Sequence, residues 1–435
     1  MKFILFKNSY GNAKFSCPSS DAISASLLDK LQENGIERAK SLDDTDLFIY
    51  IGCAALGTSL DNFVKDMKDI VGYSKAVKNM DVLVTGCVTK LDGLEDVLNK
   101  LGVKVINDKD YVTAIMNYVL NKDDESNVRN VINNNIQSYA LDNDVFLSVS
   151  IEDGCTNKCS FCKTNYLNSK VESLPYDELL EELRKRISNG CRVIDLHGEN
   201  LSLYGLDLEG KPILHRLLQD LSKENDLLNI HLGEVTVTNM YDELLDEIIN
   251  NPKVSLVSLQ LETSSDRLLK LMRRGYDIDK YDYVVRRLSE ANIGINTVLM
   301  TGFPTETYDD IDKTIEYINK RNLMIDGCCS YVDCEYLPSH DLKQLSYQEK
   351  VQHRKYFLDK SRVIRTRIMM DNICNMGNSV VFRKYDNYVV SIGSSYSFCV
   401  SGKHTNLDVG QVIKDKPRTY VKRSKFLDNN SGYKF

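Results

Sequence analysis

The chain has 435 residues, enough for roughly two or three domains. Hydrophobic residues make up 42% of it and charged residues 27%, a globular composition that argues against a disordered or collagen-like chain. No apolar run approaches the length of a membrane span, and Met1–Lys7 is too short an apolar core for a signal peptide. We therefore expect a cytoplasmic protein with no membrane partner. Its 12 cysteines indicate metal or redox chemistry rather than disulfides.

Residues 1–120 alternate buried-strand patterns with amphipathic helix patterns. Strands are predicted at Lys2–Phe6, Asp46–Ile51, Asp81–Thr85 and Val103–Ile106, and helices at Ser19–Glu33, Leu60–Val77 and from Tyr111. This alternation predicts a small, Rossmann-like parallel α/β sheet. The polar segment 121–144, rich in Asn and Asp, is predicted to be a linker.

Cysteines follow the strands of this first sheet. Cys53 and Cys87 each come after a glycine just past a strand, and Cys17 lies in the loop after the first strand. Since ligands bind beyond the carboxyl ends of parallel strands, the three thiols could meet at one edge and hold an iron–sulfur cluster with an open iron. Taken singly, each cysteine is better explained as a small buried apolar residue.

Residues 145–340 repeat strand and helix six times. The predicted strands are Phe146–Ile151, Arg192–Leu196, Asn229–Leu232, Leu256–Leu261, Ile293–Met300 and Gly327–Tyr331, with helices such as Pro175–Ser188 and Thr307–Lys320 between them. We expect a partial (β/α)6 barrel of the TIM type, with its active site at the carboxyl ends of the strands.

Three cysteines stand at Cys-x3-Cys-x2-Cys spacing straight after the first of these strands: Cys155, Cys159 and Cys162. Three thiolates on one loop can bind three irons of a four-iron cluster and leave the fourth iron for a small chelating ligand. Phe161 could pack against that ligand. Zinc is the rival metal, but a structural zinc site needs a fourth protein ligand, and no histidine or cysteine follows closely. The remaining alternative is three cysteines in a loop without metal.

Later strand ends carry further polar motifs. Gly198, Glu199 and Asn200 follow the second barrel strand, and Gly302, Phe303 and Pro304 follow the fifth. The fourth strand is followed by Gln260, Glu262 and, a little later, Arg273 and Arg274. Taken alone, Gly-Glu is usually a turn, and either arginine alone is better explained as a solvated helix end.

The last part of the chain changes character. Residues 341–374 include a predicted charged helix, Leu345–Arg367, that leads out of the barrel. In the last domain, residues 375–435, short alternating runs from Ser379 onward predict a small antiparallel β-barrel. The predicted strands are Val380–Arg383, Tyr388–Ser391, Phe398–Val400 and Gln411–Ile413. From residue 375 to 435 there are 10 Lys+Arg and 4 Asp+Glu, a net charge of +6 in a chain of net charge −7. A basic tail is typical of polyanion binding, although uneven charge on a small domain can also arise by chance.

The cysteine spacing, followed by alternating strands and helices, resembles the radical S-adenosylmethionine superfamily, and the whole chain resembles its methylthiotransferases, nearest those acting on tRNA adenosine. The resemblance implies that Cys155, Cys159 and Cys162 hold the catalytic cluster and that Cys17, Cys53 and Cys87 hold an auxiliary one, making two [4Fe-4S] clusters. Cys17 departs from the family pattern. The family places this cysteine directly after an aromatic-glycine pair, whereas residues 12–16 separate Tyr10-Gly11 from Cys17 in this chain. The C-terminal strands resemble, by position, the RNA-binding TRAM-like barrel of the family.

The resemblance also implies cofactor contacts for the motifs at the strand ends. The segment Gly198–Asn200 matches the part of the family that contacts the amino group of S-adenosylmethionine, and Arg274 could pair with its carboxylate. The turn Gly302–Pro304 would lie against the adenine, with Thr305 in place of a family glycine. Gln260 and Glu262 stand in the segment where the family has Gln-Ser-Gly-Ser-Asp.

The implied activity is insertion of a methylthio group at an unactivated C–H bond, through a 5′-deoxyadenosyl radical and with sulfur from the auxiliary cluster. We expect tRNA as substrate, at an N6-modified adenosine beside the anticodon, and an external electron donor such as flavodoxin or ferredoxin. Two segments that would border the substrate, after Cys162 and after the sixth strand, depart from the family. They leave open a protein or peptide acceptor, as in the ribosomal-protein branch. From another class, a non-catalytic iron–sulfur or RNA-binding protein is the alternative.

Overall fold

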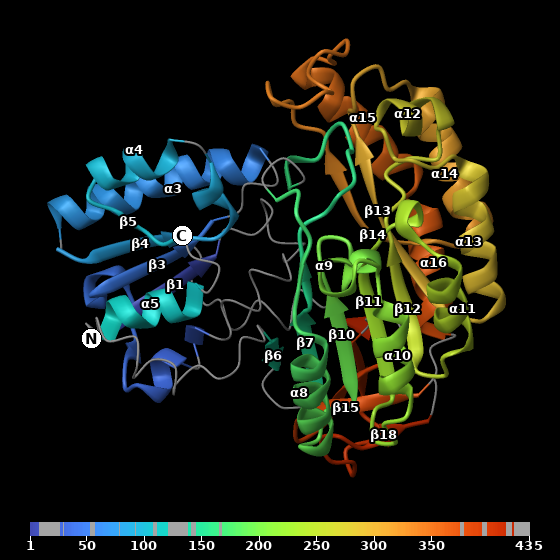
Figure 1. Ribbon diagram of the computed structural model, residues 1–435, viewed down its shortest axis with the longest axis horizontal. Coiled ribbons are helices and arrows are strands. Elements are labelled where there is room, and N and C mark those ends of the chain that lie inside the picture. The colour runs from blue at the N-terminus through green and yellow to red at the C-terminus, as the bar shows by residue number, and fades with distance from the viewer. Residues whose placement is uncertain are drawn as a thin grey trace. The chain divides into compact units, whose positions relative to one another are not determined.

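The structure is a computed structural model. It describes residues 1–7, 27–28, 30–52, 57–77, 79–91, 93–107, 111–120, 138–140, 145–164, 168–374, 378–393, 398–414 and 420–421. Contacts divide the chain into two compact units, Met1–Tyr139 and Ala140–Arg423 (Figure 1). Among the described helices, none combines the length and the apolar character that crossing a bilayer requires.

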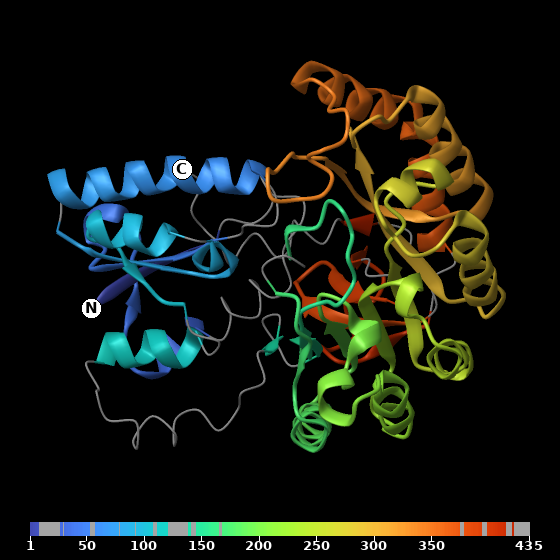
Figure 2. The same cartoon turned by 45° about the horizontal axis from the view of Figure 1, so that its top comes forward.

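The first unit is a parallel sheet with helices on both faces (Figures 1 and 2). Its strand order is β2-β1-β3-β4-β5, with β1 at Lys2–Lys7, β2 at Glu37–Arg38, β3 at Leu47–Ile51, β4 at Asp81–Thr85 and β5 at Lys104–Val105. The helices are α3 at Gly57–Ala76, α4 at Leu94–Lys100 and α5 at Tyr111–Leu120. The predicted Rossmann-like sheet is confirmed. Of the predicted helix Ser19–Glu33, only the end lies within the described residues.

Burial on both faces explains why β3 is an unbroken apolar run. Phe48 and Tyr50 pack in the same apolar cluster as Phe63 of α3, whereas Leu47 and Ile49 pack on the other side with α5. A strand of a parallel sheet that is covered twice needs apolar side chains at every position.

The second unit is built on a seven-stranded sheet whose strands follow in the order of the chain. The order is β14-β13-β12-β11-β10-β7-β6, with β6 at Ser138–Ala140, β7 at Phe146–Ser150, β10 at Val193–His197, β11 at Asn229–Val235, β12 at Val254–Leu259, β13 at Gly294–Thr301 and β14 at Met324–Ser330. Strands β7 and β10 to β14 pair in parallel. The prediction of a partial (β/α) barrel is confirmed.

Helices connect consecutive strands and cover the outside of the barrel (Figure 1). The longer ones are α8 at Tyr176–Ser188, α10 at Leu214–Ser222, α11 at Asp242–Asn250, α13 at Ile278–Glu290 and α14 at Tyr308–Arg321. Shorter elements near the strand ends are η3 at Leu201–Leu203, α9 at Leu206–Glu209, η4 at Val237–Asn239 and α12 at Asp266–Leu271.

The predicted single helix Leu345–Arg367 is wrong in two respects. Two helices stand there, α15 at Tyr347–Lys360 and α16 at Arg362–Cys374, and they break at the buried Ser361. The hydroxyl of Ser361 donates to the carbonyl of Phe357 at 2.6 Å. Both helices pack against the barrel, α15 on β13 and β14 and α16 on β14, instead of leading out of it.

A small antiparallel sheet ends the second unit. Its order is β18-β15-β16-β17-β19, with β15 at Ser379–Lys384, β16 at Val389–Ile392, β17 at Phe398–Ser401, β18 at Val412–Ile413 and β19 at Tyr420–Val421. The predicted antiparallel strands are confirmed, whereas their closure into a barrel stays a prediction. Most of the basic residues of the tail (Lys416, Arg418, Lys422, Arg423, Lys425 and Lys434) lie outside the described residues, so polyanion binding by this sheet stays a prediction.

Candidate functional site

The loop of residues 154–162 lies beyond the carboxyl end of β7. It follows β8, Glu152–Asp153, which pairs with β9, Glu172–Ser173. Gly154 has φ +92°, and a Cβ there would lie 1.8 Å from the carbonyl oxygen of Lys170. Only glycine allows the chain to turn here with its backbone against residue 170. The turn delivers Cys155, Cys159 and Cys162 in sequence, each half-buried.

Main-chain hydrogen bonds hold the middle of the loop from two sides. The N–H of Ser160 donates to the carbonyl of Met272 at 2.9 Å, and the N–H of Ser339 donates to the carbonyl of Ser160 at 3.1 Å. The hydroxyl of Ser160 also donates to the carbonyl of Leu271 at 2.8 Å. Segments after β12 and β14 therefore fix the position of the loop over the barrel.

Phe161 points into an aromatic group at the same end of the barrel. Its ring lies 6.4 Å from the ring of Phe303, edge-on, and Phe303 lies 5.4 Å from Tyr331. Phe303 is fully buried. The turn at Gly302 and Pro304, predicted to lie beside the adenine, is thus attached to the cysteine loop through apolar packing. The buried Glu306 carboxylate fixes this turn by accepting the N–H of Gly302 at 2.6 Å and bonding His353 at 2.7 Å.

Asn200 lies at the first cysteine. Its amide donates to Cys155 Sγ at 3.6 Å and to Asn239 Oδ1 at 2.7 Å, and its carbonyl oxygen accepts from the hydroxyl of Thr236 at 3.1 Å. Burial raises the pKa of the Cys155 thiol, while hydrogen bonds from Asn157 and Asn200 lower it. The structure thus brings two predicted site residues, Asn200 and Cys155, into contact.

Glu152 supports the segment Gly198–Asn200 from below. Its carboxyl oxygen accepts the N–H of Asn200 at 3.0 Å, and a Cβ on Gly198 would lie only 2.3 Å from the same oxygen. Burial raises the pKa of Glu152 to about 9, although the N–H of Asn200 acts in the opposite direction. Glu152 is therefore a neutral acid at pH 7 that fixes the backbone on both sides of the half-buried Glu199.

Arg274 lies at the second cysteine. Its guanidinium donates to Cys159 Sγ at 3.4 Å and to the carbonyl of Gln260 at 2.9 Å, and its Nε donates to the hydroxyl of Tyr276 at 3.1 Å. Arg274 is buried, whereas its neighbour Arg273 is exposed with φ +56°. Arg274 thus faces the inside of the site, and the consecutive residue Arg273 faces the outside.

Gln260 and Glu262 come from the end of β12. The amide of Gln260 is held by Ser258 at 3.0 Å and by the N–H of Val298 at 3.3 Å, so its side chain bridges strands. Glu262 has φ +66°, an unusual value for a non-glycine residue. Burial raises the pKa of Glu262, although Arg274 acts in the opposite direction. The backbone of Glu262 bonds β13 through Val298 and Met300.

The donor set fits an iron–sulfur cluster better than a single ion. Within the described ranges, no three His, Cys, Asp or Glu side chains are grouped closely enough to bind one metal ion. In a cluster each cysteine binds a different iron, so its thiols stand farther apart than the ligands of one zinc ion. Two of the three sulfurs already accept hydrogen bonds, from Asn200 and Arg274. Such hydrogen bonds are typical around cluster sulfurs.

Of the three cysteines predicted to form the auxiliary site, the structure describes Cys87. Cys87 is half-buried in η2, Cys87–Lys90, directly after β4. Cys17 and Cys53 lie outside the described residues. The three-cysteine auxiliary site therefore stays a prediction. Of the remaining cysteines near the barrel end, Cys328 is buried and Cys329 and Cys334 are half-buried.

Sequence reasoning missed Glu152 and the pair Thr236 and Asn239. The pair escaped notice because the third barrel strand was predicted to end at Leu232, whereas β11 runs to Val235 and places both residues at the strand end. A signal existed, because three of the four residues from Thr236 to Asn239 are polar, as expected at a strand end in such a site.

A family model described as the radical SAM superfamily matches residues 149–318, the part of the chain that contains this site. A tRNA-2-methylthio-N(6)-dimethylallyladenosine synthase of Thermotoga petrophila is 25% identical over 365 residues, covering 81% of this chain and 82% of the relative. The chain is thus similar, over most of its length, to radical S-adenosylmethionine methylthiotransferases. The superfamily that this model describes is named for S-adenosylmethionine, which agrees with the cofactor contacts expected at this site.

Other relatives of this chain are named for a different substrate. The ribosomal protein uS12 methylthiotransferase RimO of Syntrophus aciditrophicus is 26% identical over 370 residues and covers 80% of both chains. Among solved structures, the radical S-adenosylmethionine methyltransferase TsrM of Kitasatospora setae aligns with a TM-score of 0.52 at 11% identity, covering 78% of this chain and 74% of that one. This last likeness concerns the fold alone.

Proposed function

We propose that the protein is a methylthiotransferase that modifies an N6-modified adenosine beside the anticodon of tRNA. The observation that carries the reaction class is the arrangement of Cys155 and Cys159, whose sulfurs accept hydrogen bonds from Asn200 and Arg274. These two donors come from the segments to which the family resemblance assigns cofactor contacts. Such an arrangement serves a cluster and its bound cofactor together.

When bound, the catalytic cluster supplies the electron that cleaves S-adenosylmethionine, and the auxiliary cluster supplies sulfur. The residues of this chain would bind the cluster and orient S-adenosylmethionine beside it. Glu199 would accept the cofactor ammonium in a charge-assisted hydrogen bond, and Arg274 would pair with its carboxylate. The turn at Gly302 and Pro304 would border the adenine. Cys155, Cys159 and Cys162 would hold the catalytic cluster.

The auxiliary cluster is proposed at Cys17, Cys53 and Cys87. Two [4Fe-4S] clusters then imply about eight irons per chain after anaerobic reconstitution. The Cys53→Ala and Cys87→Ala variants should each lose about half of the iron and sulfide, whereas Cys328→Ala should lose none. Unchanged iron in both of the first two variants would contradict the auxiliary cluster.

The choice of tRNA over protein rests on the excess of positive charge after residue 375 and on relatives named for tRNA. A protein acceptor is the second candidate, favoured by a relative of similar identity named for a ribosomal protein. Either acceptor would have to present its C–H bond to the same 5′-deoxyadenosyl radical, so identifying the modified molecule is what distinguishes the two candidates.

The test is mass spectrometry of nucleosides from tRNA incubated with reconstituted enzyme, S-adenosylmethionine and reductant. We expect a methylthio group on an adenosine derivative, and none with Cys159→Ala. Deoxyadenosine formed without any modified nucleoside would reject tRNA and favour a protein acceptor. No deoxyadenosine from enzyme with a full complement of iron would reject the reaction class.

A further inference from the structure

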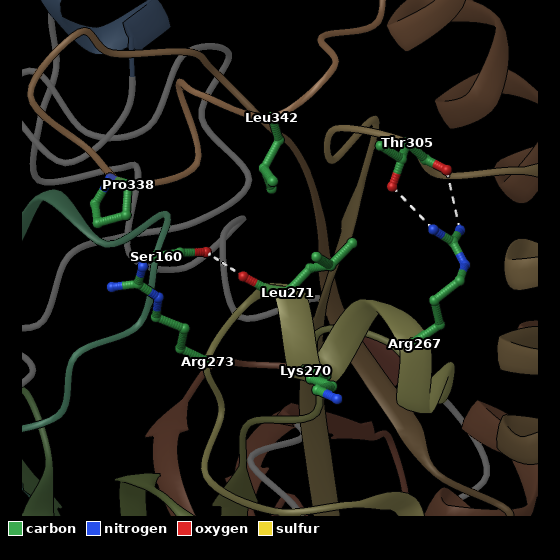
Figure 3. A pocket seen from close by; sticks show the side chains of 8 residues that line it. All are labelled: Ser160, Arg267, Lys270, Leu271, Arg273, Thr305, Pro338 and Leu342. Atoms are coloured by element: carbon green, nitrogen blue, oxygen red, sulfur yellow. Dashed lines mark hydrogen bonds between the residues drawn. The ribbon is translucent and has the colours of Figure 1, made fainter.

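A cavity lined by cations lies directly outside the cysteine loop (Figure 3). Its volume is about 640 Å³, and its lining residues are Ser160, Arg267, Lys270, Leu271, Arg273, Thr305, Pro338 and Leu342. Figure 3 shows Pro338 and Leu342 along one side and the residues of α12 along the other. No acidic side chain is among its lining residues.

The three cationic side chains of the cavity, Arg267, Lys270 and Arg273, differ in their polar partners. The guanidinium of Arg267 bonds the hydroxyl and the carbonyl of Thr305 at 2.9 and 3.0 Å and pairs with Asp310. Lys270 and Arg273 are exposed, and their side chains make no ion pair or hydrogen bond with another residue in the part of the chain that the structure describes. The cavity therefore presents two uncompensated positive charges to solvent.

The position of the cavity relates it to the catalytic cluster. Ser160, which lines it, stands between Cys159 and Phe161, and its hydroxyl bonds Leu271 of the opposite wall. Arg274 reaches the sulfur of Cys159 from the inside, whereas Arg273 lines the cavity outside. The cavity is thus adjacent to the cluster loop through Ser160, and Arg273 on its wall is exposed, whereas Arg274 beside it is buried.

We propose that this cavity docks a small acidic protein that carries one electron, and that Lys270 and Arg273 receive its carboxylates. In the docked complex the carrier is oxidised by one electron and the cluster is reduced by one electron, with no atom transferred. A weak, salt-sensitive contact suits this task, because redox partners bind through small interfaces and must leave again. An RNA substrate fits the site less well, because its target base must reach the inner side of the loop.

The inference rests on the radical chemistry of the proposed function and not on the choice of tRNA or protein as acceptor. The test compares two reductants for the reconstituted enzyme, a fully reduced flavodoxin and dithionite, by following the loss of visible cluster absorption in a stopped-flow instrument. Dithionite is small and needs no docking surface. Reduction of the cluster requires no acceptor substrate, so the assay remains informative if no methylthio product is found.

The Lys270→Glu/Arg273→Glu variant should slow reduction by flavodoxin about tenfold or more at low ionic strength, because charge reversal removes electrostatic steering. Its dithionite rate should stay within about twofold of wild type. The matched control is Lys211→Glu/Lys320→Glu, a reversal of two exposed lysines of the same unit that do not line the cavity, and it should leave both rates unchanged. The wild-type flavodoxin rate should fall with added salt, and the cavity variant should show a flatter dependence.

Calorimetric titration with oxidised flavodoxin gives a second readout that requires no turnover. The cavity variant should bind about tenfold more weakly than the control variant. Equal flavodoxin rates in the cavity variant and the control would overturn the proposal, and so would a parallel loss of the flavodoxin and dithionite rates. Loss of tRNA binding with unchanged reduction by flavodoxin would also overturn it and assign the cavity to RNA.

Discussion

Glu152 shows how one buried acid can position a binding segment without touching the ligand. Its carboxyl holds the N–H of Asn200 at 3.0 Å and lies against Gly198, on either side of Glu199. We expect Glu152→Ala to weaken S-adenosylmethionine binding about fivefold, since one buried hydrogen bond contributes about 1 kcal/mol. Glu152→Gln should keep most of the affinity, because the amide oxygen can accept the same N–H.

Equilibrium dialysis with labelled S-adenosylmethionine measures this effect. Glu178→Ala, an exposed acid on α8, is the control and should bind as wild type does. A Glu152→Ala variant that binds as tightly as wild type would show that the Gly198–Asn200 segment keeps its shape without this carboxyl.

A substitution at Arg274 tests whether deoxyadenosine formation needs the several planar N–H donors of a guanidinium or only a positive charge at this position. Its guanidinium reaches Cys159 Sγ, the carbonyl of Gln260 and the hydroxyl of Tyr276. A lysine carries the same charge as a point and cannot serve these three acceptors from one plane. Arg274→Lys should retain its iron yet form deoxyadenosine at least about tenfold more slowly, measured by chromatography. Arg286→Lys, on the outer face of α13, should match wild type, and equal rates for both variants would argue for charge alone.

At the level of elements, α14 begins with a capping box that also serves the site. The hydroxyl of Thr307 accepts the N–H of Asp310, and the Asp310 carboxylate accepts the N–H of Thr307. The same carboxylate bonds Ser265 at 2.6 Å and pairs with Arg267. Thr307→Ala should lower the free energy of unfolding by about 1 kcal/mol, measured by urea unfolding, whereas Thr307→Ser should change little. Equal losses in both variants would point to the methyl group and not to the cap.

Sequence patterns predicted the central parts of the elements better than their ends. The strands β4 and β7 were placed within a residue or so, because an apolar run bounded by turn residues is a local signal. The break between α15 and α16 was missed, because no proline or glycine marks it. It depends on Ser361 being buried beside the barrel, which local sequence does not encode.

The same contrast holds for the site. The cysteine loop and the turn after β13 were found because their residue types and spacing are chemically unusual. The neighbours that hold the Gly198–Asn200 segment were not found. Glu152 and Thr236 are ordinary polar residues, and their role appears only when residues of β8 and the end of β11 meet Asn200 in the fold. The resemblance favoured Arg274 over Arg273 for the cofactor carboxylate, and the structure adds that Arg274 reaches Cys159. Geometry gives the reason, since Arg273 has φ +56° and stands outside.

For the whole molecule, two buried groups couple stability to alkaline pH. Asp195 bonds the His197 ring at 2.5 Å, and Glu234 lies at 3.4 Å from it. Burial would lower the pKa of His197, but these two carboxylates raise it to about 9. The stabilisation from protonated His197 is complete below pH 6.5, its unfolded pKa, and is lost as pH rises through about 9. Glu152, with a pKa raised from 4.5 to about 9, keeps a proton that the unfolded chain releases, so it also destabilises the fold as pH rises over that range.

We therefore expect the free energy of unfolding to fall between pH 6.5 and 8.5. Glu152→Gln should remove up to about 1.4 kcal/mol per pH unit of that slope, because it removes one titrating proton. Urea unfolding followed by circular dichroism at several pH values measures this. The difference between variant and wild type cancels the titration of the cysteines. Identical slopes would mean that Glu152 is ionised in the folded protein.

The main-chain hydrogen bonds that fix Ser160 have a consequence for the synthesis of the protein. Its two main-chain partners, Met272 and Ser339, are synthesised long after the three cysteines beside it. At a synthesis rate of ~5–20 residues per second, the three thiols are present in the nascent chain, without these two main-chain hydrogen bonds, for on the order of ten seconds or more. We therefore expect stable cluster insertion to follow the synthesis of residue 339, when both main-chain bonds can form. Slower translation of the barrel in air should raise the fraction of chains whose thiols are oxidised before iron reaches them.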